Sequence, residues 1–471
     1  MEDQNTYIDI ANNMGSNSRG SDWVPLKNRE RLSILHILGI CFGLLACQTC
    51  YTVIQSLGEP IMKNLGFTNT QSDYLWLVGP LTAFFFQPLI GYFSDGCHAK
   101  LGRRRPYIIA GTFFSLLSFV IIFKVEAISA FIYPSNPKKL GIPLFCIAFF
   151  ILYVAINCIQ GPTRAIIGDL VPDSQLAIAN NFASWIFGLG ALITNLIGGL
   201  NIAQYTKHFQ GYELIFLLGV IFITISSILT CICGKEEQFT ENIERENPFK
   251  ELYIALTTMP KPASRIAIVY FFSWMGFQPT NIKITPYIAQ DIYGETDPSS
   301  QLYHEGVCFG MLIMACQNLV VLFYSPFQDA IVKKIGNAWT YAISQIVTAC
   351  CLFPIFFIKN KWIAMALFIP LGLSFTTFCS IPFTILSLSV APEKLALYMG
   401  ALNSFCVLGQ EVAYGVMNIV GRLTPLLGPV IATGCIFSII SAILCSRIII
   451  PGSNDNKTVT DSPLLEDPSL M

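Results

Sequence analysis

Long apolar runs alternate with short polar segments along most of the 471-residue chain. Each run is close in length to the roughly 20 residues that an α-helix needs to cross a bilayer. The pattern predicts an all-α membrane protein with twelve transmembrane helices. The expected spans cover residues 32–55, 72–93, 106–132, 143–170, 176–200, 213–233, 265–290, 305–327, 337–358, 361–389, 396–420 and 426–450.

A polar landmark occurs twice between apolar runs. Asp95 is followed seven residues later by Gly102, and Asp329 is followed at the same spacing by Gly336. A membrane chain whose halves repeat a landmark in the same direction is typical of transporters built from parallel repeats. We therefore expect two six-helix halves, at residues 32–233 and 265–450, with a disordered N-tail at 1–31, a central loop at 234–264 and a C-tail at 451–471.

The composition agrees with this class of protein. The chain is 53% hydrophobic and only 12% charged, whereas soluble domains carry about 25% charged residues. Most of the 28 Lys and Arg residues fall in the tails, the central loop and the loops on the same side, which predicts cytoplasmic termini. The acidic central loop is expected to be a solvated linker. The 16 cysteines lie mainly in apolar runs and only four histidines are present, so no metal site or disulfide framework is predicted.

The landmark itself contains candidate gate residues. In the first half, Gly91 and Asp95 end an apolar run, and Gly102 with three arginines begins the next. Such arginines can simply set membrane topology. Because an aspartate beside them can form charge-assisted hydrogen bonds, they can also latch the cytoplasmic side in one state. The candidate gate comprises Gly91, Asp95, Gly102, Arg103, Arg104 and Arg105 with their counterparts Asp329, Lys333, Lys334 and Gly336.

Polar residues inside the expected spans are candidates for substrate binding. Asn157, Gln160 and Arg164 follow Tyr153 at helical spacing, so these side chains share one face. Arg164 either lines a cavity or extends to the inner surface. We expect polar and aromatic side chains to bind a substrate between the halves, and the set comprises Gln48, Tyr153, Asn157, Gln160, Trp274, Asn403 and Gln410.

Ionisable residues inside the expected spans are candidates for ion coupling. Lys283 lies in a span interrupted by two prolines and needs a cavity or an acidic partner, unless it reaches the outer surface. Glu411 lies deep in its span, where it either carries a proton or pairs with a cation such as Lys283. Glu59 is expected at the outer mouth, as a solvated cap or a substrate ligand.

Several motifs resemble one transporter family. The motifs are Trp76-Leu-Val-Gly79-Pro80, Gln87-Pro88, GYFSD, GRRRPYI, Gln160-Gly161-Pro162 with Arg164, Phe272-Ser-Trp274, Asp291-Ile-Tyr293-Gly294 and Ser380-Ile381-Pro382. They resemble the plant sucrose–proton symporters and their animal relatives, which are glycoside–pentoside–hexuronide cation symporters of the major facilitator superfamily. The resemblance implies the major facilitator fold and sugar–proton symport by alternating access.

The chain departs from this family at acidic positions. Where the family has an aspartate eleven residues before the arginine of the Gln-Gly-Pro motif, this chain has Tyr153. Ile284 and Pro286 replace two further aspartates of the plant members. A tyrosine, with a reference pKa of about 10, does not cycle protons near neutral pH. Either Glu411 or Asp291 has taken over proton coupling, or the coupling is lost.

The expected function is therefore sugar transport, of sucrose or a related glycoside, driven by a proton gradient and without a bound cofactor. An uncoupled facilitator and a membrane sugar sensor are the alternatives, and an enzyme is disfavoured because no HExxH or P-loop is present. We expect a monomer in the lipid bilayer that binds no nucleic acid. A C-terminal Asp461-Ser-Pro-Leu-Leu pattern is compatible with an endosomal, lysosomal or vacuolar membrane as well as with the plasma membrane.

Overall fold

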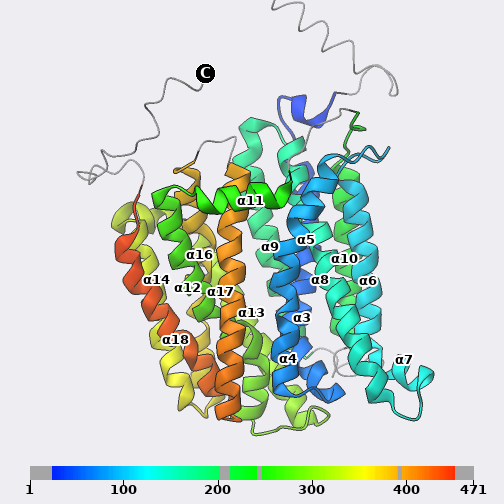
Figure 1. Cartoon of the computed structure of the whole chain (residues 1–471), viewed down its shortest axis with the longest axis vertical. Helices are drawn as coiled ribbons and strands as arrows, with labels where there is room; N and C mark the ends of the chain where they lie inside the picture. The colour runs from blue at the N-terminus through cyan, green and yellow to red at the C-terminus, as the bar shows by residue number, and fades with distance from the viewer. Residues whose placement is uncertain (1–23, 202–212, 241–246, 391–394, 451–471) are drawn as a thin grey trace, which may run out of the picture.

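A bundle of long helices forms the molecule (Figure 1). The computed structural model describes residues 24–201, 213–240, 247–390 and 395–450. The first half contains α2 (Ile34–Cys41), α3 (Gly43–Leu65), α4 (Asn69–Trp76), α5 (Val78–Asp95), α6 (Arg105–Phe123), α7 (Val125–Ile132), α8 (Pro137–Leu170), α9 (Leu176–Gly199) and α10 (Glu213–Cys233). The second half contains α12 (Lys261–Tyr287), a π-helical turn η4 (Ile288–Ile292), α13 (Gln301–Ile335), α14 (Asn337–Leu352), α15 (Lys361–Phe368), α16 (Leu371–Ser387), α17 (Leu395–Leu423) and α18 (Leu427–Leu444).

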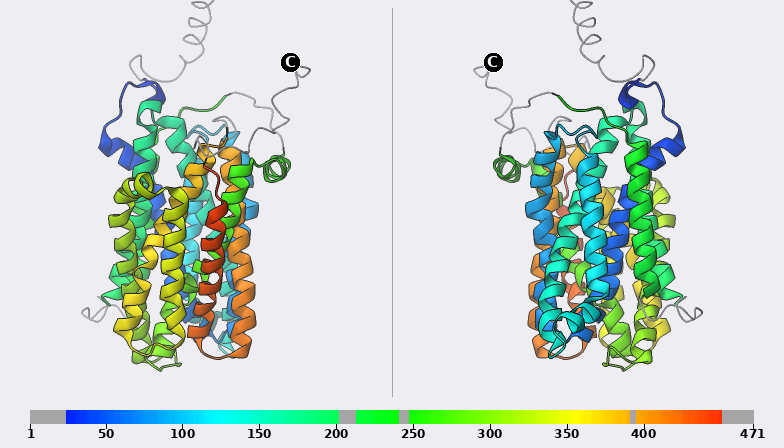
Figure 2. Two further views of the ribbon diagram at one scale, coloured as in Figure 1. Left: turned by 90° about the vertical axis from the view of Figure 1, so that its left-hand side faces the viewer. Right: turned by 90° about the vertical axis from the view of Figure 1, so that its right-hand side faces the viewer.

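The predicted all-α class with two six-helix halves is confirmed. Ten helical stretches of the described chain are long and apolar enough to cross a membrane. The remaining two long helices, α12 and α17, run alongside them in the same bundle but carry more polar side chains. The two side views of Figure 2 show the long helices aligned along one axis. Several helices extend beyond the predicted spans, because hydropathy marks only the part of a helix that lies in lipid.

The two ends of the bundle are distinct. Both ends of the described chain lie at one end, which we call the terminal end (Figure 1). There α11 (Pro248–Thr257) lies across the bundle, and it contacts α17 and α5. The central segment was expected to be a plain linker, so this helix corrects that expectation. Asn247 accepts a hydrogen bond from the Phe249 N–H and caps α11, which explains where it begins.

The opposite end, here called the far end, brings α3 and α4 together. Gly66 ends α3 with a φ of 93°, a conformation that favours glycine. Two residues later, Thr68 and Gln71 form a reciprocal capping box that starts α4. The tight reversal places α4 beside the last turns of α3, so side chains from the two helices can meet.

The two halves share apolar contacts. One core cluster contains side chains of α3, α8 and α10 together with Ile282, Tyr303 and Met311 from the second half. A separate cluster fills the interior of the second half around Tyr270 and Phe378. Close helix packing in that half depends on glycine, because a Cβ at Gly434 would lie 2.2 Å from the Gly276 carbonyl oxygen.

Gly434→Ala should therefore destabilise the protein. The added methyl group has to separate α12 from α18, and overpacking of this kind costs about 1–3 kcal/mol. Thermal unfolding in detergent should show a lower midpoint for this variant. Gly421→Ala in α17 is the control, because a Cβ there meets nothing within 4 Å. Equal midpoints for Gly434→Ala and the control would contradict the close approach of α12 and α18.

Candidate functional site

Three buried charged side chains connect the two halves at the far end. Lys283 of α12 places Nζ 3.0 Å from Glu59 Oε1 on α3 and 2.8 Å from Asp73 Oδ1 on α4. The exposed fractions are 2% for Lys283, 0% for Glu59 and 5% for Asp73. Trp76 Nε1 donates a hydrogen bond to Glu59 Oε2 at 3.0 Å. We call Glu59, Asp73 and Lys283 the far-end triad.

The far-end triad corrects the expectation for Glu59 and agrees with one of the alternatives for Lys283. Glu59 was expected to be a solvated cap or a substrate ligand at the outer mouth, but α4 and α12 cover it completely. Lys283 does have the acidic partners that its position required, and these are Glu59 and Asp73 rather than Glu411. Sequence reasoning missed Asp73, because it lies at the start of an expected span and looks like an exposed cap. The only signal in the sequence was that Lys283, a lysine within a span, requires an acidic partner.

Other contacts also bring the halves together near the triad. Thr285 Oγ1 of α12 donates a hydrogen bond to the Ser56 carbonyl oxygen at 2.8 Å. Within the first half, Ser56 Oγ donates to Asn195 Oδ1 of α9 at 2.9 Å, which positions the residue that Thr285 contacts. A Cβ at Gly199 would lie 2.5 Å from the Leu312 backbone nitrogen, so α9 and α13 pack backbone to backbone. The far end is therefore closed between the halves.

Arg164 occupies a different environment, nearer the terminal end. Its side chain is exposed, yet it interacts electrostatically with groups from both halves. These groups are Cys47 and Tyr51 on α3, Tyr270 on α12 and Cys379 on α16. Cys379 is also exposed. Arg164 therefore faces accessible space between the halves rather than the lipid.

Residues around Arg164 offer further polar and aromatic groups. Tyr51 donates a hydrogen bond to Gln160 Oε1 at 3.3 Å, and the Tyr51 and Tyr153 rings are 6.0 Å apart. Asn157 is buried and donates to the Tyr153 carbonyl oxygen of its own helix at 2.9 Å. The predicted face of α8 is thus brought together with α3.

Several buried polar atoms in this region have no hydrogen-bond partner. They are Asn157 Oδ1, Trp274 Nε1, Gln278 Oε1 and Glu411 Oε1. Because buried polar atoms are nearly always paired, each of these atoms is suited to a water molecule or a bound ligand. Gln278, which the sequence prediction did not include, donates its amide to Tyr414 at 2.6 Å. Tyr414 is in electrostatic range of both Tyr153 and Glu411.

The second half contributes an aromatic cluster. Trp274 packs edge-on against Phe378, with ring centroids 5.0 Å apart, and contacts Tyr270 and Phe375 at 6.2 and 6.3 Å. Its indole N–H is left unpaired at the edge of this cluster. Such a surface combines apolar area with a hydrogen-bond donor, a combination that suits the faces and hydroxyl groups of a sugar ring.

The remaining candidates occupy varied positions. Gln48 donates to Thr52 on its own helix at 3.3 Å, and Gln410 donates to Cys406 Sγ at 3.2 Å. Asn403 is partly buried. Asp291 instead accepts the N–H groups of Leu427 and Gly428, at 2.9 and 2.7 Å, and so caps the start of α18. A structural role accounts for both contacts of its carboxylate. Across the described residues, no group of three or more His, Cys, Asp or Glu could hold a metal ion.

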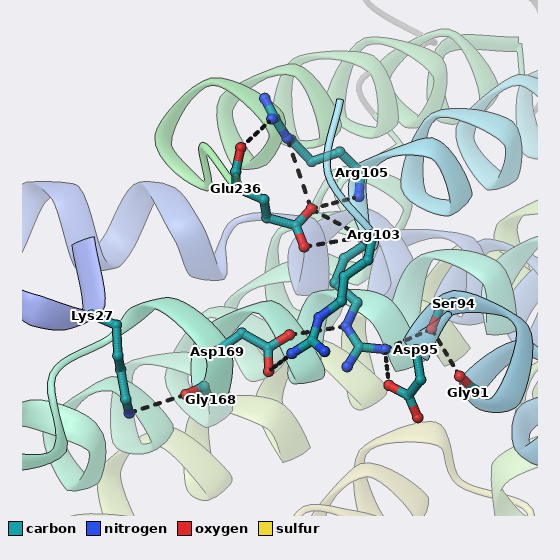
Figure 3. Close-up of polar contacts among 10 residues, drawn as sticks. Lys27, Gly91, Ser94, Asp95, Arg103, Arg105, Gly168, Asp169 and Glu236 are labelled. Carbon is teal, nitrogen blue, oxygen red and sulfur yellow. Dashed lines mark hydrogen bonds and ion pairs between the residues drawn. The ribbon is translucent and has the colours of Figure 1, made fainter. Parts of the chain in front are cut away.

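At the terminal end, the first landmark forms the expected ion pairs (Figure 3). Arg104 Nη1 lies 2.5 Å from Asp95 Oδ1 and donates to Ser94 Oγ at 2.7 Å. Asp169, at the end of α8, joins the group through Arg104 at 3.0 Å and Arg103 at 2.8 Å. These contacts connect α5, α6 and α8 within the first half.

Glu236 of the central segment completes this group, and it too was expected to be solvated. Its buried carboxylate accepts the backbone N–H groups of Arg104 and Arg105 at 3.0–3.1 Å, at the start of α6 (Figure 3). Burial raises the pKa of Glu236, and those two N–H groups oppose the rise. Gly102, with a φ of 100°, leaves room for it, since a Cβ there would lie 2.4 Å from Glu236 Cβ.

The second landmark is less well defined. Lys333 and Lys334 are exposed at the end of α13, and Gly336 follows with a φ of 85°. The side chain of Asp329 lies outside the described part of the structure. No pairing can therefore be assigned to the second landmark, and its gate role stays a prediction.

Comparison with known proteins identifies the family. The model of the Major Facilitator Superfamily matches residues 40–414. The chain belongs to this superfamily. Sucrose transport protein SUC4 of Arabidopsis thaliana is 26% identical over 446 residues, covering 86% of this chain and 87% of the relative. Sucrose transport protein SUT2 of Oryza sativa subsp. japonica is 26% identical, with 84% of each chain covered.

Other transporters are also similar to this chain. The general alpha-glucoside permease of Schizosaccharomyces pombe is 27% identical over 267 residues, which cover 54% of this chain and 48% of the permease. A POT family transporter in complex with 5-aminolevulinic acid has a TM-score of 0.67 at 12% identity, covering 90% of this chain and 98% of the other. A bacterial homologue of the lysosomal transporter Spinster, in an inward-facing and unoccupied conformation, has a TM-score of 0.59 at 12% identity, with 88% and 95% covered.

Removing the central charge of the far-end triad should strongly destabilise this superfamily member. Lys283→Met leaves Glu59 and Asp73 buried without a cation, and breaking a buried ion pair costs about 3–5 kcal/mol. Thermal unfolding in detergent measures the loss. The matched control is Lys124→Met, because Lys124 and Glu213 form an exposed pair at 3.3 Å that contributes about 0–1 kcal/mol.

A triple variant tests whether the unpaired charge is the cause. Replacing all three members, as Glu59→Gln, Asp73→Asn and Lys283→Met, should recover most of the lost stability, because no buried charge then lacks a partner. A Lys283→Met protein as stable as the Lys124→Met control would show that the triad does not hold the far end.

Proposed function

We propose that this protein is a secondary carrier that moves sucrose or a related glucoside across a membrane by alternating access. The observation that carries the proposal is the contrast between the two ends. The buried far-end triad joins the halves at one end, whereas Arg164 lies between the halves and is exposed. A carrier that opens to one side at a time requires this arrangement. The sucrose transport proteins that resemble the chain along most of its length supply the substrate class.

The chemistry between the halves suits a sugar. A sugar presents many hydroxyl groups and apolar ring faces, so its site needs unpaired donors and acceptors beside aromatic rings. Asn157 and Gln278 offer unpaired oxygens, and Trp274 offers an unpaired N–H within an aromatic cluster. Arg164 would bind a group of hydroxyls or pair with an acid. Gln48, Tyr153, Gln160, Asn403 and Gln410 complete the proposed lining.

We assign the terminal end to the cytoplasm. The landmark arginines lie there, as do α11 and the start of the described chain with Lys27, Arg29 and Arg31, and positive charge accumulates on the cytoplasmic side of membrane proteins. The far end would then face the outside or the lumen of an organelle. The sorting pattern that begins at Asp461 lies outside the described residues, so the plasma membrane and the endosomal, lysosomal or vacuolar membranes remain the candidates.

The proposed carrier uses a proton gradient and works as a monomer. Tyr153 does not serve as the proton carrier for the reason given above, so an acid elsewhere in the chain has to do so. An uncoupled facilitator is the second candidate, and the tyrosine at this position favours it. No reaction is proposed, because binding and release of an unchanged sugar account for the groups described.

Purified protein in liposomes tests the proposal. Liposomes preloaded with unlabelled sucrose should take up labelled sucrose by exchange, at equal pH on both sides, because exchange requires only alternating access. Protein-free liposomes and liposomes loaded with mannitol give the background. An inward proton gradient should then drive accumulation above equilibrium. Absence of exchange with sucrose, maltose and other glucosides would overturn the proposal, whereas exchange without accumulation would favour the facilitator.

Asp95→Ala tests the proposed terminal latch. In this state the pair with Arg104 connects α5 to the start of α6 within the first half, so the latch requires its contribution to change when the terminal end closes. Because Asp95 is half exposed, the pair contributes about 1 kcal/mol, and exchange should slow by roughly fivefold while the protein elutes as wild type. Unchanged exchange by well-folded Asp95→Ala protein would exclude the latch.

A further inference from the structure

The far-end triad has more negative than positive charge. Two carboxylates, of Glu59 and Asp73, share the single ammonium group of Lys283 in a site that water hardly reaches. Lys63 of α3 is in electrostatic range of both acids, but within the described residues no ion pair joins it to either. Lys63 therefore offsets the second carboxylate only without direct contact. A buried carboxylate with so little direct compensation is costly, and a proton is the simplest ligand that removes its charge.

The two acids are held differently. Glu59 is bonded through both oxygens, by Lys283 Nζ and by the Trp76 indole N–H. For Asp73, Lys283 is the ion-pair partner among the described residues. Protonation of Glu59 would disturb two contacts, whereas protonation of Asp73 disturbs one. Asp73 is therefore the acid that releases its partner more easily.

Asp73 is also the member nearest to water. It lies about 6 Å along α4 from Asn69, at 1.5 Å per residue, and Thr68 and Asn69 are exposed at the far end. Of the three side chains, Asp73 has the largest exposed fraction. A proton from the far side therefore reaches Asp73 before it reaches Glu59.

The surroundings contain few other groups that could take this proton. The titratable and charged side chains in electrostatic range of the triad are Lys63 on α3, Tyr414 on α17 and Tyr303 on α13, and Asp291 on η4 is in range of Lys63. Asp291 is already bonded to two backbone N–H groups, and the tyrosines are neutral near neutral pH. Within the buried junction of the halves, Asp73 is thus the acid that a proton reaches most easily.

We propose that the proton that couples to transport binds Asp73 from the far side and thereby weakens the junction of the far end, which then keeps only the ion pair of Lys283 with Glu59. The carboxylate takes up one proton, Lys283 stays paired with Glu59, and α12 loses its ionic contact with α4. When the halves close again, Lys283 returns between the two acids and its charge favours loss of the proton. The proton is then released to water on the terminal side, which is the open side once the far end has closed. The inference rests on the proposed carrier function and places coupling at the junction of the halves instead of at Tyr153.

Asp73→Asn tests proton coupling separately from the movement of sucrose. The variant removes the excess charge while Lys283 keeps Glu59, so it should fold and still exchange labelled sucrose in liposomes at equal pH, within about threefold of wild type. It should no longer accumulate sucrose under an inward proton gradient, whereas wild type should reach up to about tenfold accumulation per pH unit for one coupled proton. Asp73→Glu keeps a titratable group and should retain accumulation. Asp297→Asn, an exposed far-end acid outside the triad, is the matched control and should behave as wild type.

Each outcome separates the two proposals. Gradient-driven sucrose accumulation by Asp73→Asn equal to that of wild type would contradict the assignment of Asp73 as the coupling site. The same holds if Glu411→Gln loses accumulation while Asp73→Asn retains it. If wild type exchanges sucrose but does not accumulate it, proton coupling at Asp73 is contradicted, whereas the carrier function is supported.

A second measurement needs no substrate. It tests the role of Asp73 even if the wild-type protein does not transport sucrose. Hydrogen exchange of residues 56–77, corrected for the intrinsic effect of pH, should become faster in wild type as the pH falls, because the far end opens. In Asp73→Asn this opening should not depend on pH. The same pH dependence in both proteins would overturn the role of Asp73.

Discussion

The structure depends on the burial of three charges where the two halves meet. A lysine inside a membrane protein has to be paired or hydrated, and Lys283 is paired with acids from the opposite half. Because separating a buried ion pair leaves a charge without its partner, this contact opposes separation of the two halves at the far end. The same contact therefore stabilises one state and penalises the transition out of it. Neighbouring backbone contacts, such as the close packing of Gly199 against Leu312, also join the two halves at this junction.

The two ends of the molecule use charge in different ways. At the far end the two ion pairs of Lys283 cross between the halves and are buried. At the terminal end, Arg104, Asp95 and Asp169 connect helices of one half, and Glu236 fixes the central segment to the start of α6. The terminal contacts thus keep one half rigid without closing the space near Arg164. Alternating access needs this combination of rigid halves and a breakable junction.

The sequence predicted the fold well because its signals were local. Apolar length indicated the helices, and the repeated Asp-Gly spacing indicated two halves. The pairing of Asp95 with the arginines was also predictable, since these residues are separated only by a short loop. The far-end triad was not, because Glu59 and Lys283 are distant in the chain and Asp73 resembles an exposed cap. Glu236 was missed for a related reason: an acidic segment looks solvated until a helix start with unpaired N–H groups is placed beside it.

One measurement tests the central claim, that the junction at the far end and the space at the terminal end open in turn. Spin labels at Lys138 and Gln301, which are exposed on opposite halves at the far end, report one distance. Labels at His98 and Lys334, exposed at the terminal end, report the other, after accessible native cysteines are replaced. Sucrose and acid should lengthen the far-end distance while they shorten the terminal-end distance. Distances that change in the same direction, or a far-end distance that never changes, would contradict the account.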